Sequence, residues 1–271
     1  EAMAGAIVGS LNNILVAHIE GGEVSGTIDE LIRHAVSKLS HIHFVSNEKA
    51  KQRLIQLGEL PSSIFVIGSP DLDVMNASTL PTIDEVRGKY EIPFEHFHIF
   101  MYHPVTTEAD KISGHINGLI EGLVESKENF VVIYPNNDHG SHHILEAIQP
   151  LKDNEQFRVF PSMRFEYFLA AIKNATSLIG NSSAGVREAP FYGIPSINIG
   201  SRQANRANAQ SIINISDSKL DLLAAISQAK NLECEKTKEF GSGDSAALFS
   251  QVLNSERVWK VNHQKSFVDT F

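Results

Sequence analysis

The feature that most constrains this chain is a regular alternation of short apolar runs with segments of helical pattern. Its first part predicts strands at residues 14–19, 41–45 and 64–68 and a helix at residues 28–39. A second helix is expected to begin at Ser46 or Asn47 and to end at Leu57. The run at 14–19 is typical of a parallel strand buried on both faces. Thr27 and Glu30 have the spacing of a capping box. This alternation predicts parallel crossovers and an α/β fold.

A second alternating series begins after a turn-rich stretch at residues 71–82. It predicts strands at residues 96–103, 130–134, 157–160, 177–180, 195–200 and 211–215, and helices at residues 83–89, 110–125, 141–151, 163–172, 184–192, 217–229 and 244–253. We therefore expect two α/β domains, of which the second is doubly wound and Rossmann-like. The expected limits are 1–72 for the first domain, 73–250 for the second and 251–271 for a C-terminal helix or tail.

Composition narrows the class of protein. Of 271 residues, 42% are hydrophobic and 20% charged, and the formal net charge is -9, which argues against nucleic acid as the main partner. Apolar runs stay well short of the roughly 18 residues that a membrane span needs. The single cysteine, Cys234, excludes an internal disulfide framework and a four-cysteine zinc site. A reducing, cytoplasmic location is expected.

The chain opens inside an apolar stretch, EAMAGAIVGSL, which reads as the middle of a helix. It has neither a helix cap nor the architecture of a signal peptide there. We expect that part of the first domain lies upstream of Glu1.

The stretch GNSSAGVRE predicts an anion site where a strand passes into a helix. Ser182 or Ser183 can cap the helix, and the free amides of its first turn, Gly185 included, can hold a diphosphate. Capping without any ligand is the alternative, because neither GxGxxG nor GxxxxGK[ST] is present. Glu188 lies close enough to accept both hydroxyls of a ribose, and the alternative for it is a solvated surface carboxylate.

Other polar residues follow strands of the second series, where ligands of such sheets bind. Arg202 comes directly after a strand and suits bidentate phosphate contact. His103 can donate to phosphate or act as an acid or base, or it can close its strand with a backbone hydrogen bond. Asn136 ends the next strand along the chain.

Carboxylates cluster in HIEGGEVSGTIDE, near the end of the first strand. Glu20 and Asp29 can face one cleft, the arrangement that paired acid and base chemistry needs. One of Asp29 and Glu30 is expected to serve only as a helix-start charge. The histidines of DHGSHH suggest a metal, but only His139 and His143 share a helical face, and we expect no metal site.

With these motifs in hand, the chain resembles the hydrolysing UDP-N-acetylglucosamine 2-epimerases of sialic and related nonulosonic acid synthesis. The resemblance covers the whole length and is carried by AHIEGGEVSGTIDELIRHAVSKLSHIHFVSN, YHPVTT, PNNDHGS and GNSSAGVREAPFYGIPSINIGSRQ. It implies two Rossmann-like domains, similar to glycosyltransferase-B enzymes, with the active site between them and a final helix that returns to the first domain. It also implies a GDR-type motif with a catalytic aspartate, which this sequence lacks, just before Glu1.

The resemblance implies a role for each site residue. Ser182, Ser183 and the turn amides would hold the diphosphate of UDP, with Glu188 on the ribose. Arg202 and His103 would contact the phosphates or the developing charge, and Glu20 and Asp29 would act at the sugar.

The reaction implied is an elimination followed by hydration, without a cofactor, that converts UDP-GlcNAc and water to N-acetylmannosamine and UDP in a homodimer or homotetramer. The alternatives are the same reaction on UDP-N,N'-diacetylbacillosamine, a non-hydrolysing epimerase, and a UDP-sugar-binding fragment without activity.

Overall fold

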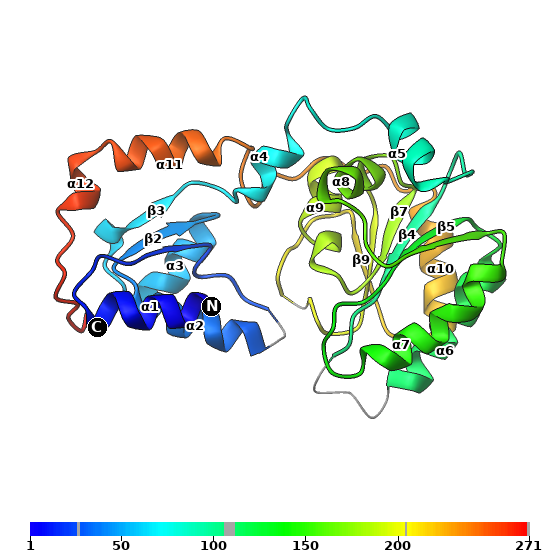
Figure 1. Cartoon of the computed structure of the whole chain (residues 1–271), viewed down its shortest axis with the longest axis horizontal. Coiled ribbons are helices and arrows are strands. Elements are labelled where there is room, and N and C mark those ends of the chain that lie inside the picture. The colour runs from blue at the N-terminus through cyan, green and yellow to red at the C-terminus, as the bar shows by residue number, and fades with distance from the viewer. Residues whose placement is uncertain (26–27, 106–111, 204, 270–271) are drawn as a thin grey trace. The chain divides into compact units, whose positions relative to one another are not determined.

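The computed structural model describes residues 1–25, 28–105, 112–203 and 205–269, with the backbone alone at Ile28. The chain divides into two compact units (Figure 1), the first made of residues 1–77 and 238–271 and the second of residues 78–237. Both are α/β units with parallel sheets, which confirms the expected fold class. Among the described residues, no helix combines the length and apolar character needed to cross a membrane.

In the described residues, the first unit contains a parallel sheet of three strands in the order β1 (Ala17–Ile19), β2 (Ile42–Val45) and β3 (Ile64–Val66). Its helices are α1 (Ala2–Leu11), α2 (Ile28–Leu39), α3 (Glu48–Gln56), α4 (Asp71–Met75), α11 (Ser245–Leu253) and α12 (Glu256–Trp259), with a 3-10 turn at Pro61–Ser63. The capping box predicted at Thr27 lies outside the described residues. The start of α3 is set by Asn47, whose side chain accepts a hydrogen bond from the Ala50 amide at 2.8 Å.

The prediction that residues 14–19 form a strand buried on both faces is wrong. Only Ala17–Ile19 is a strand, it lies at one end of the described sheet order, and Ile14 and Ile19 are 57% and 47% exposed. An apolar run therefore predicted the strand but not its burial.

Strand β2 alternates between two cores. Ile42 and Phe44 pack with α11 and α12, whereas Val45 packs with α3. Figure 1 shows the sheet between these two helical layers. Burial on both faces explains the apolar residues Ile42, Phe44 and Val45, whereas the buried His43 is satisfied by a hydrogen bond with Glu59 at 3.0 Å.

Helix α11 belongs to the first unit, although the sequence placed residues up to 250 in the second domain. Phe249 packs against Phe44, with ring centroids 4.6 Å apart and the ring planes tilted by 60°. The Asp73 carboxylate accepts hydrogen bonds from the amides of Ser245 and Ala246, at 2.8 and 2.7 Å, and so caps the start of the helix. Because of this apolar packing and this cap, the chain from Lys238 onward belongs to the first unit.

The described second unit is a six-stranded parallel sheet in the order β6-β5-β4-β7-β8-β9. The strands are β4 (His98–Met101), β5 (Phe130–Ile133), β6 (Phe157–Phe160), β7 (Ser177–Gly180), β8 (Ser196–Ile199) and β9 (Ile212–Ile215). In chain order this is 3-2-1-4-5-6, the order of dinucleotide-binding sheets, in which ligands bind at the carboxyl ends of the two central strands. Here those strands are β4 and β7.

Helices cover both faces of this sheet (Figure 1). They are α5 (Ile83–Tyr90), α6 (Ile112–Ser126), α7 (Ser141–Ile148), α8 (Phe165–Lys173), α9 (Glu188–Tyr192) and α10 (Lys219–Ala229), with 3-10 turns at Gln149–Asp153 and Ser183–Gly185. The largest described core joins α6, α7 and α10 to one face, around Phe100, Phe130 and Ile197. The expected start of α6 at residue 110 lies outside the described residues.

The predicted continuous helix 184–192 is wrong, because a 3-10 turn at Ser183–Gly185 is followed by the separate helix α9 at Glu188–Tyr192. Pro190 explains the break. It has no amide hydrogen, and its ring would clash with the carbonyl of Val186 in an uninterrupted helix, whereas a proline is tolerated in a first turn.

We predict that Gly180→Ala destabilises the second unit by on the order of 3 kcal/mol. Gly180 has φ +138°, and an added Cβ would lie 1.9 Å from the Met101 carbonyl oxygen of the neighbouring strand. Gly118→Ala in α6 is the matched control, since nothing lies within 4 Å of its added Cβ and alanine favours a helix. Urea unfolding of the two variants measures both effects, and equal stabilities would contradict the prediction.

Candidate functional site

At the carboxyl end of the second sheet, Asn181 joins the two central strands. The side chain of this fully buried residue accepts a hydrogen bond from the His103 amide at 2.7 Å and donates one to the His103 carbonyl at 2.8 Å. It therefore pairs with His103 as another strand would. We had not predicted Asn181 as a site residue, although an amide side chain directly after a buried strand was a usable signal.

The His103 ring is held in one tautomer. Its Nδ1 accepts a hydrogen bond from the Asn136 amide at 3.0 Å, so in the neutral ring the proton is on Nε2. Burial first, and the Arg202 charge second, lower the pKa of His103 to about 4. His103 thus makes the backbone hydrogen bond considered in the sequence and keeps a neutral Nε2–H donor as well.

Asn136 contributes more than its amide. Its Oδ1 is buried and has no hydrogen-bond partner among the described residues, while its Nδ2 donates to Asp138. A buried acceptor of this kind is costly unless something bonds to it.

Ser182, Ser183 and Gly185 form the turn after β7. Ser182 is its cap, accepting a hydrogen bond from the Ala184 amide at 3.3 Å. The amides of Gly185 and Val186 also donate within the turn, at 3.1 and 3.0 Å. They can reach a diphosphate only by sharing these hydrogens or by opening the turn, which differs from the expected unengaged amides. Packing also favours glycine at position 185, because an added Cβ would lie 2.6 Å from Ser196 Oγ.

Glu188 begins α9 and is only 8% exposed, so the alternative of a solvated surface carboxylate is wrong. Burial, and then the charge of Glu188, raise the pKa of the Tyr192 hydroxyl above its ordinary value. Glu188 is therefore a buried negative charge beside the turn that follows β7.

The loop after β8 is fastened to Asn181. Arg202 Nη1 and Gln203 Nε2 both donate to the Asn181 carbonyl, at 3.1 and 2.9 Å. Arg206 donates to Gln203 Oε1 at 2.9 Å. Asn181 thus fixes His103 through its side chain and Arg202 through its backbone.

In the first unit, carboxylates pair with hydroxyls at the carboxyl ends of the strands. Glu20, after β1, has φ +64° and accepts a hydrogen bond from the Ser69 hydroxyl at 2.5 Å. Glu23 is buried and accepts one from Ser46, after β2. A left-handed backbone is uncommon outside glycine and marks a position fixed by its surroundings.

Asp29 and Glu30 differ in role. Glu30 Oε2 accepts a hydrogen bond from the Ser25 amide at 2.7 Å and so anchors the loop before α2. Asp29 is exposed in the same first turn. Glu30 thus has a structural role at the start of the helix.

His18 lies in β1, two residues before Glu20. Its Nδ1 lies 3.0 Å from Ser37 Oγ of α2. Burial, followed by the charges of His43 and Arg33, lowers the pKa of His18 to about 4. A neutral imidazole ring thus lies close in the chain to the carboxylate of Glu20.

The histidines of DHGSHH do not gather as ligands. The rings of His142 and His143 have centroids 3.9 Å apart and planes tilted by 40°. Within the described ranges, no group of three or more His, Cys, Asp or Glu side chains could hold a metal ion.

Comparison with known proteins identifies the family. The family model described as UDP-N-acetylglucosamine 2-epimerase matches residues 1–254. A UDP-N-acetylglucosamine 2-epimerase of Neisseria meningitidis is 49% identical over 99% of this chain and 72% of the relative. A hydrolyzing UDP-N,N'-diacetylbacillosamine 2-epimerase of Legionella pneumophila is 34% identical over 94% of this chain and 68% of the relative.

Solved structures share the fold. The crystal structure of the Methanocaldococcus jannaschii UDP-GlcNAc 2-epimerase in complex with UDP-GlcNAc and UDP aligns with a TM-score of 0.74 and 21% identity, over 93% of this chain and 72% of that chain. On the family match and the 49% identity, the chain belongs to the UDP-N-acetylglucosamine 2-epimerase family.

Proposed function

We propose that the chain is a hydrolysing UDP-N-acetylglucosamine 2-epimerase, which converts UDP-GlcNAc and water to N-acetylmannosamine and UDP. The observation that carries the proposal is the neutral His103, fixed with Arg202 on Asn181 at the central strands of a nucleotide-type sheet. Family membership supplies the epimerase class. The hydrolysing branch is supported by the 34% identity to a relative named as hydrolyzing.

In this proposal the second unit binds UDP. Ser182, Ser183 and the turn at Gly185 contact the diphosphate, and Glu188 accepts the ribose hydroxyls. Arg202 supplies the positive charge that a diphosphate requires in a protein of net charge -9. Asn136 Oδ1 is suited to a donor on the ligand, because it is buried without a partner among the described residues.

The first step is an elimination. The proton at C2 of the sugar becomes acidic only as the C1–O bond to UDP weakens, so the two bonds break together. Glu20 takes the proton from C2, while UDP leaves from C1 with the bonding electron pair, giving 2-acetamidoglucal. His103, through Nε2–H, and Arg202 stabilise the charge that grows on the leaving diphosphate.

The second step is hydration of the glucal. Asp29 activates the water that adds its oxygen at C1, and a proton returns to C2 on the opposite face, which gives the epimer as a free sugar. The net reaction is redox-neutral, and the proposal assigns it no cofactor.

Ser69 supports the assignment of Glu20, because a donated hydroxyl hydrogen bond fixes the orientation of the base. We also propose a homodimer or homotetramer.

A second substrate is favoured by the same comparison. UDP-N,N'-diacetylbacillosamine carries another acylated amine but has the same C1 and C2 chemistry, and the Legionella relative is named for it. The ratio of kcat/KM for the two nucleotide sugars, measured on protein expressed from the complete reading frame, decides between them.

Turnover of UDP-GlcNAc in D2O is expected to release UDP and N-acetylmannosamine with one deuterium at C2. The reason is that the proton removed in the elimination exchanges with solvent before hydration. Proton NMR of the product and an assay for UDP release provide the measurement. A product that remains attached to UDP would indicate the non-hydrolysing reaction, and a product without deuterium would contradict proton abstraction.

Glu20→Gln is expected to lower kcat by about 10²-fold or more, because an amide cannot take the proton. The dissociation constant for UDP should stay unchanged, since the UDP contacts are proposed in the second unit. Glu48→Gln is the control, because it removes one charge from an exposed carboxylate on α3. Equal kcat values for the two variants would rule out Glu20 as the base.

His103 is expected to stay neutral, with its proton on Nε2, down to pH about 4. UDP affinity should therefore show no titration of His103 between pH 8 and 5. Because the unfolded chain binds this proton near pH 6.5, His103 lowers the stability of the fold as pH falls from 6.5 to about 4 and has no effect above that range. Nitrogen-15 NMR of the histidine rings reads tautomer and pKa together, and a His103 pKa near 6.5 would refute the expectation.

A further inference from the structure

Lys265, in the C-terminal strap (residues 261–269), is bound by three oxygen atoms. Its Nζ donates to the carbonyls of Ser37 and Ser40, at 3.0 and 2.6 Å, and to Glu59 Oε2 at 2.6 Å. An ammonium group has three N–H donors, so these contacts satisfy all of them. These three contacts hold the half-buried Lys265 side chain in one defined position.

Two of these oxygens belong to the C-terminal end of α2, which ends at Leu39. The last carbonyls of a helix lack partners within it and carry the negative end of the helix dipole. A lysine is suited to that place. Lys265 therefore caps α2, although 225 residues separate it from Ser40.

The third oxygen belongs to a buried carboxylate that joins several elements. Glu59 is 2% exposed and contacts Lys38 of α2 at 2.9 Å, His43 of β2 at 3.0 Å and Lys265 of the strap at 2.6 Å. Burial alone would raise the pKa of Glu59, but these three hydrogen-bonding partners lower it to about 2. Burial keeps the pKa of His43 below its usual range, so the two lysines carry the positive charge.

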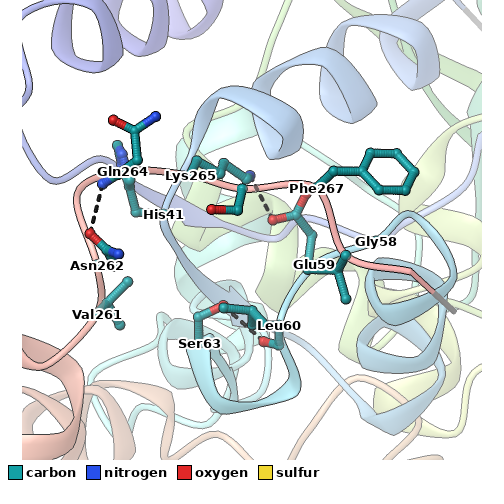
Figure 2. A pocket seen from close by; sticks show the side chains of 12 residues that line it. His41, Gly58, Glu59, Leu60, Ser63, Val261, Asn262, Gln264, Lys265 and Phe267 are labelled. Atoms are coloured by element: carbon teal, nitrogen blue, oxygen red, sulfur yellow. Dashed lines mark hydrogen bonds and ion pairs between the residues drawn. The ribbon is translucent and has the colours of Figure 1, made fainter.

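The strap makes an apolar contact at its first residue, Val261, which packs against the core around Ile42 and Phe44. A cavity of about 200 Å³ lies against it, lined by the strap and by residues around Gly58 and Ser63, and Figure 2 shows Lys265 meeting Glu59 there. Phe267 is 86% exposed. The other described hydrogen bonds from the strap to the rest of the unit are polar contacts of His263, with His41 Nε2 at 3.1 Å and the Asn13 carbonyl at 3.0 Å.

We infer that Lys265 is a positioning residue, which fixes α2 from its C-terminal end and thereby orients Asp29 in its first turn. This inference rests on the proposed role of Asp29. Ser37 extends the effect, because its carbonyl binds Lys265 while its hydroxyl contacts His18, in the strand before Glu20. The strap is thus linked to the elements that carry both proposed catalytic carboxylates.

The test compares Lys265→Met with Lys260→Met in protein from the complete reading frame. Lys260 is a matched control directly before the strap, exposed and paired with Glu256 alone among the described residues. We expect Lys265→Met to speed amide hydrogen exchange at the C-terminal end of α2 about tenfold. We also expect kcat to fall about tenfold with KM unchanged, because orientation and not binding is lost. Lys265→Arg, which keeps charge and donors, should recover part of both.

Unchanged exchange in α2 for Lys265→Met would overturn the inference. Faster exchange with unchanged kcat would overturn the positioning role, since the contact would then be structural only. If the wild-type protein turns over neither nucleotide sugar, the proposed function fails, and the exchange comparison alone then supports or overturns the capping of α2 by Lys265.

Discussion

Asn181 stands where β4 and β7 diverge, at the centre of the second sheet. Strand pairing ends at Met101 and Gly180, and beyond it the two backbones would expose unpaired amides and carbonyls. The carboxamide of Asn181 supplies one donor and one acceptor to His103 and so continues the pairing with a side chain. Its own carbonyl then accepts from Arg202 and Gln203. One buried residue therefore sets the positions of a neutral donor and a cation.

In the first unit, charged side chains occupy the positions beyond the strand ends. Beyond the ends of its strands, Glu20 and Glu23 accept from the hydroxyls of Ser69 and Ser46. A hydroxyl hydrogen bond orients a carboxylate without placing a positive charge beside it. The first unit thus holds oriented carboxylates, and the second unit holds a neutral donor and a cation.

Local rules predicted most of the fold. Period and apolar runs gave the α/β class, and Asn47 was one of the two residues expected to begin α3. The failures came from interactions that local patterns do not contain. Pro190 breaks a helix that periodicity continues, β1 is apolar yet exposed, and α11 is assigned by its contact with Phe44, far away in the sequence. At the site, the strand ends predicted His103 and Arg202 but not Asn181, whose function appears only when β4 and β7 lie side by side.

Lys265 is the clearest example of an interaction that local sequence patterns do not contain. Its contribution to stability alone does not explain why a lysine occupies this position. A buried ion pair loses much of its attraction to desolvation, and apolar residues of similar volume are often equally stabilising. An apolar side chain could fill the space at Glu59, but it could not bind two helix carbonyls and a carboxylate in fixed directions. The charged side chain therefore fixes the position of the strap relative to α2. A fixed position of this kind suits the catalytic role that we propose for Glu20 and Asp29, which requires both carboxylates to be oriented.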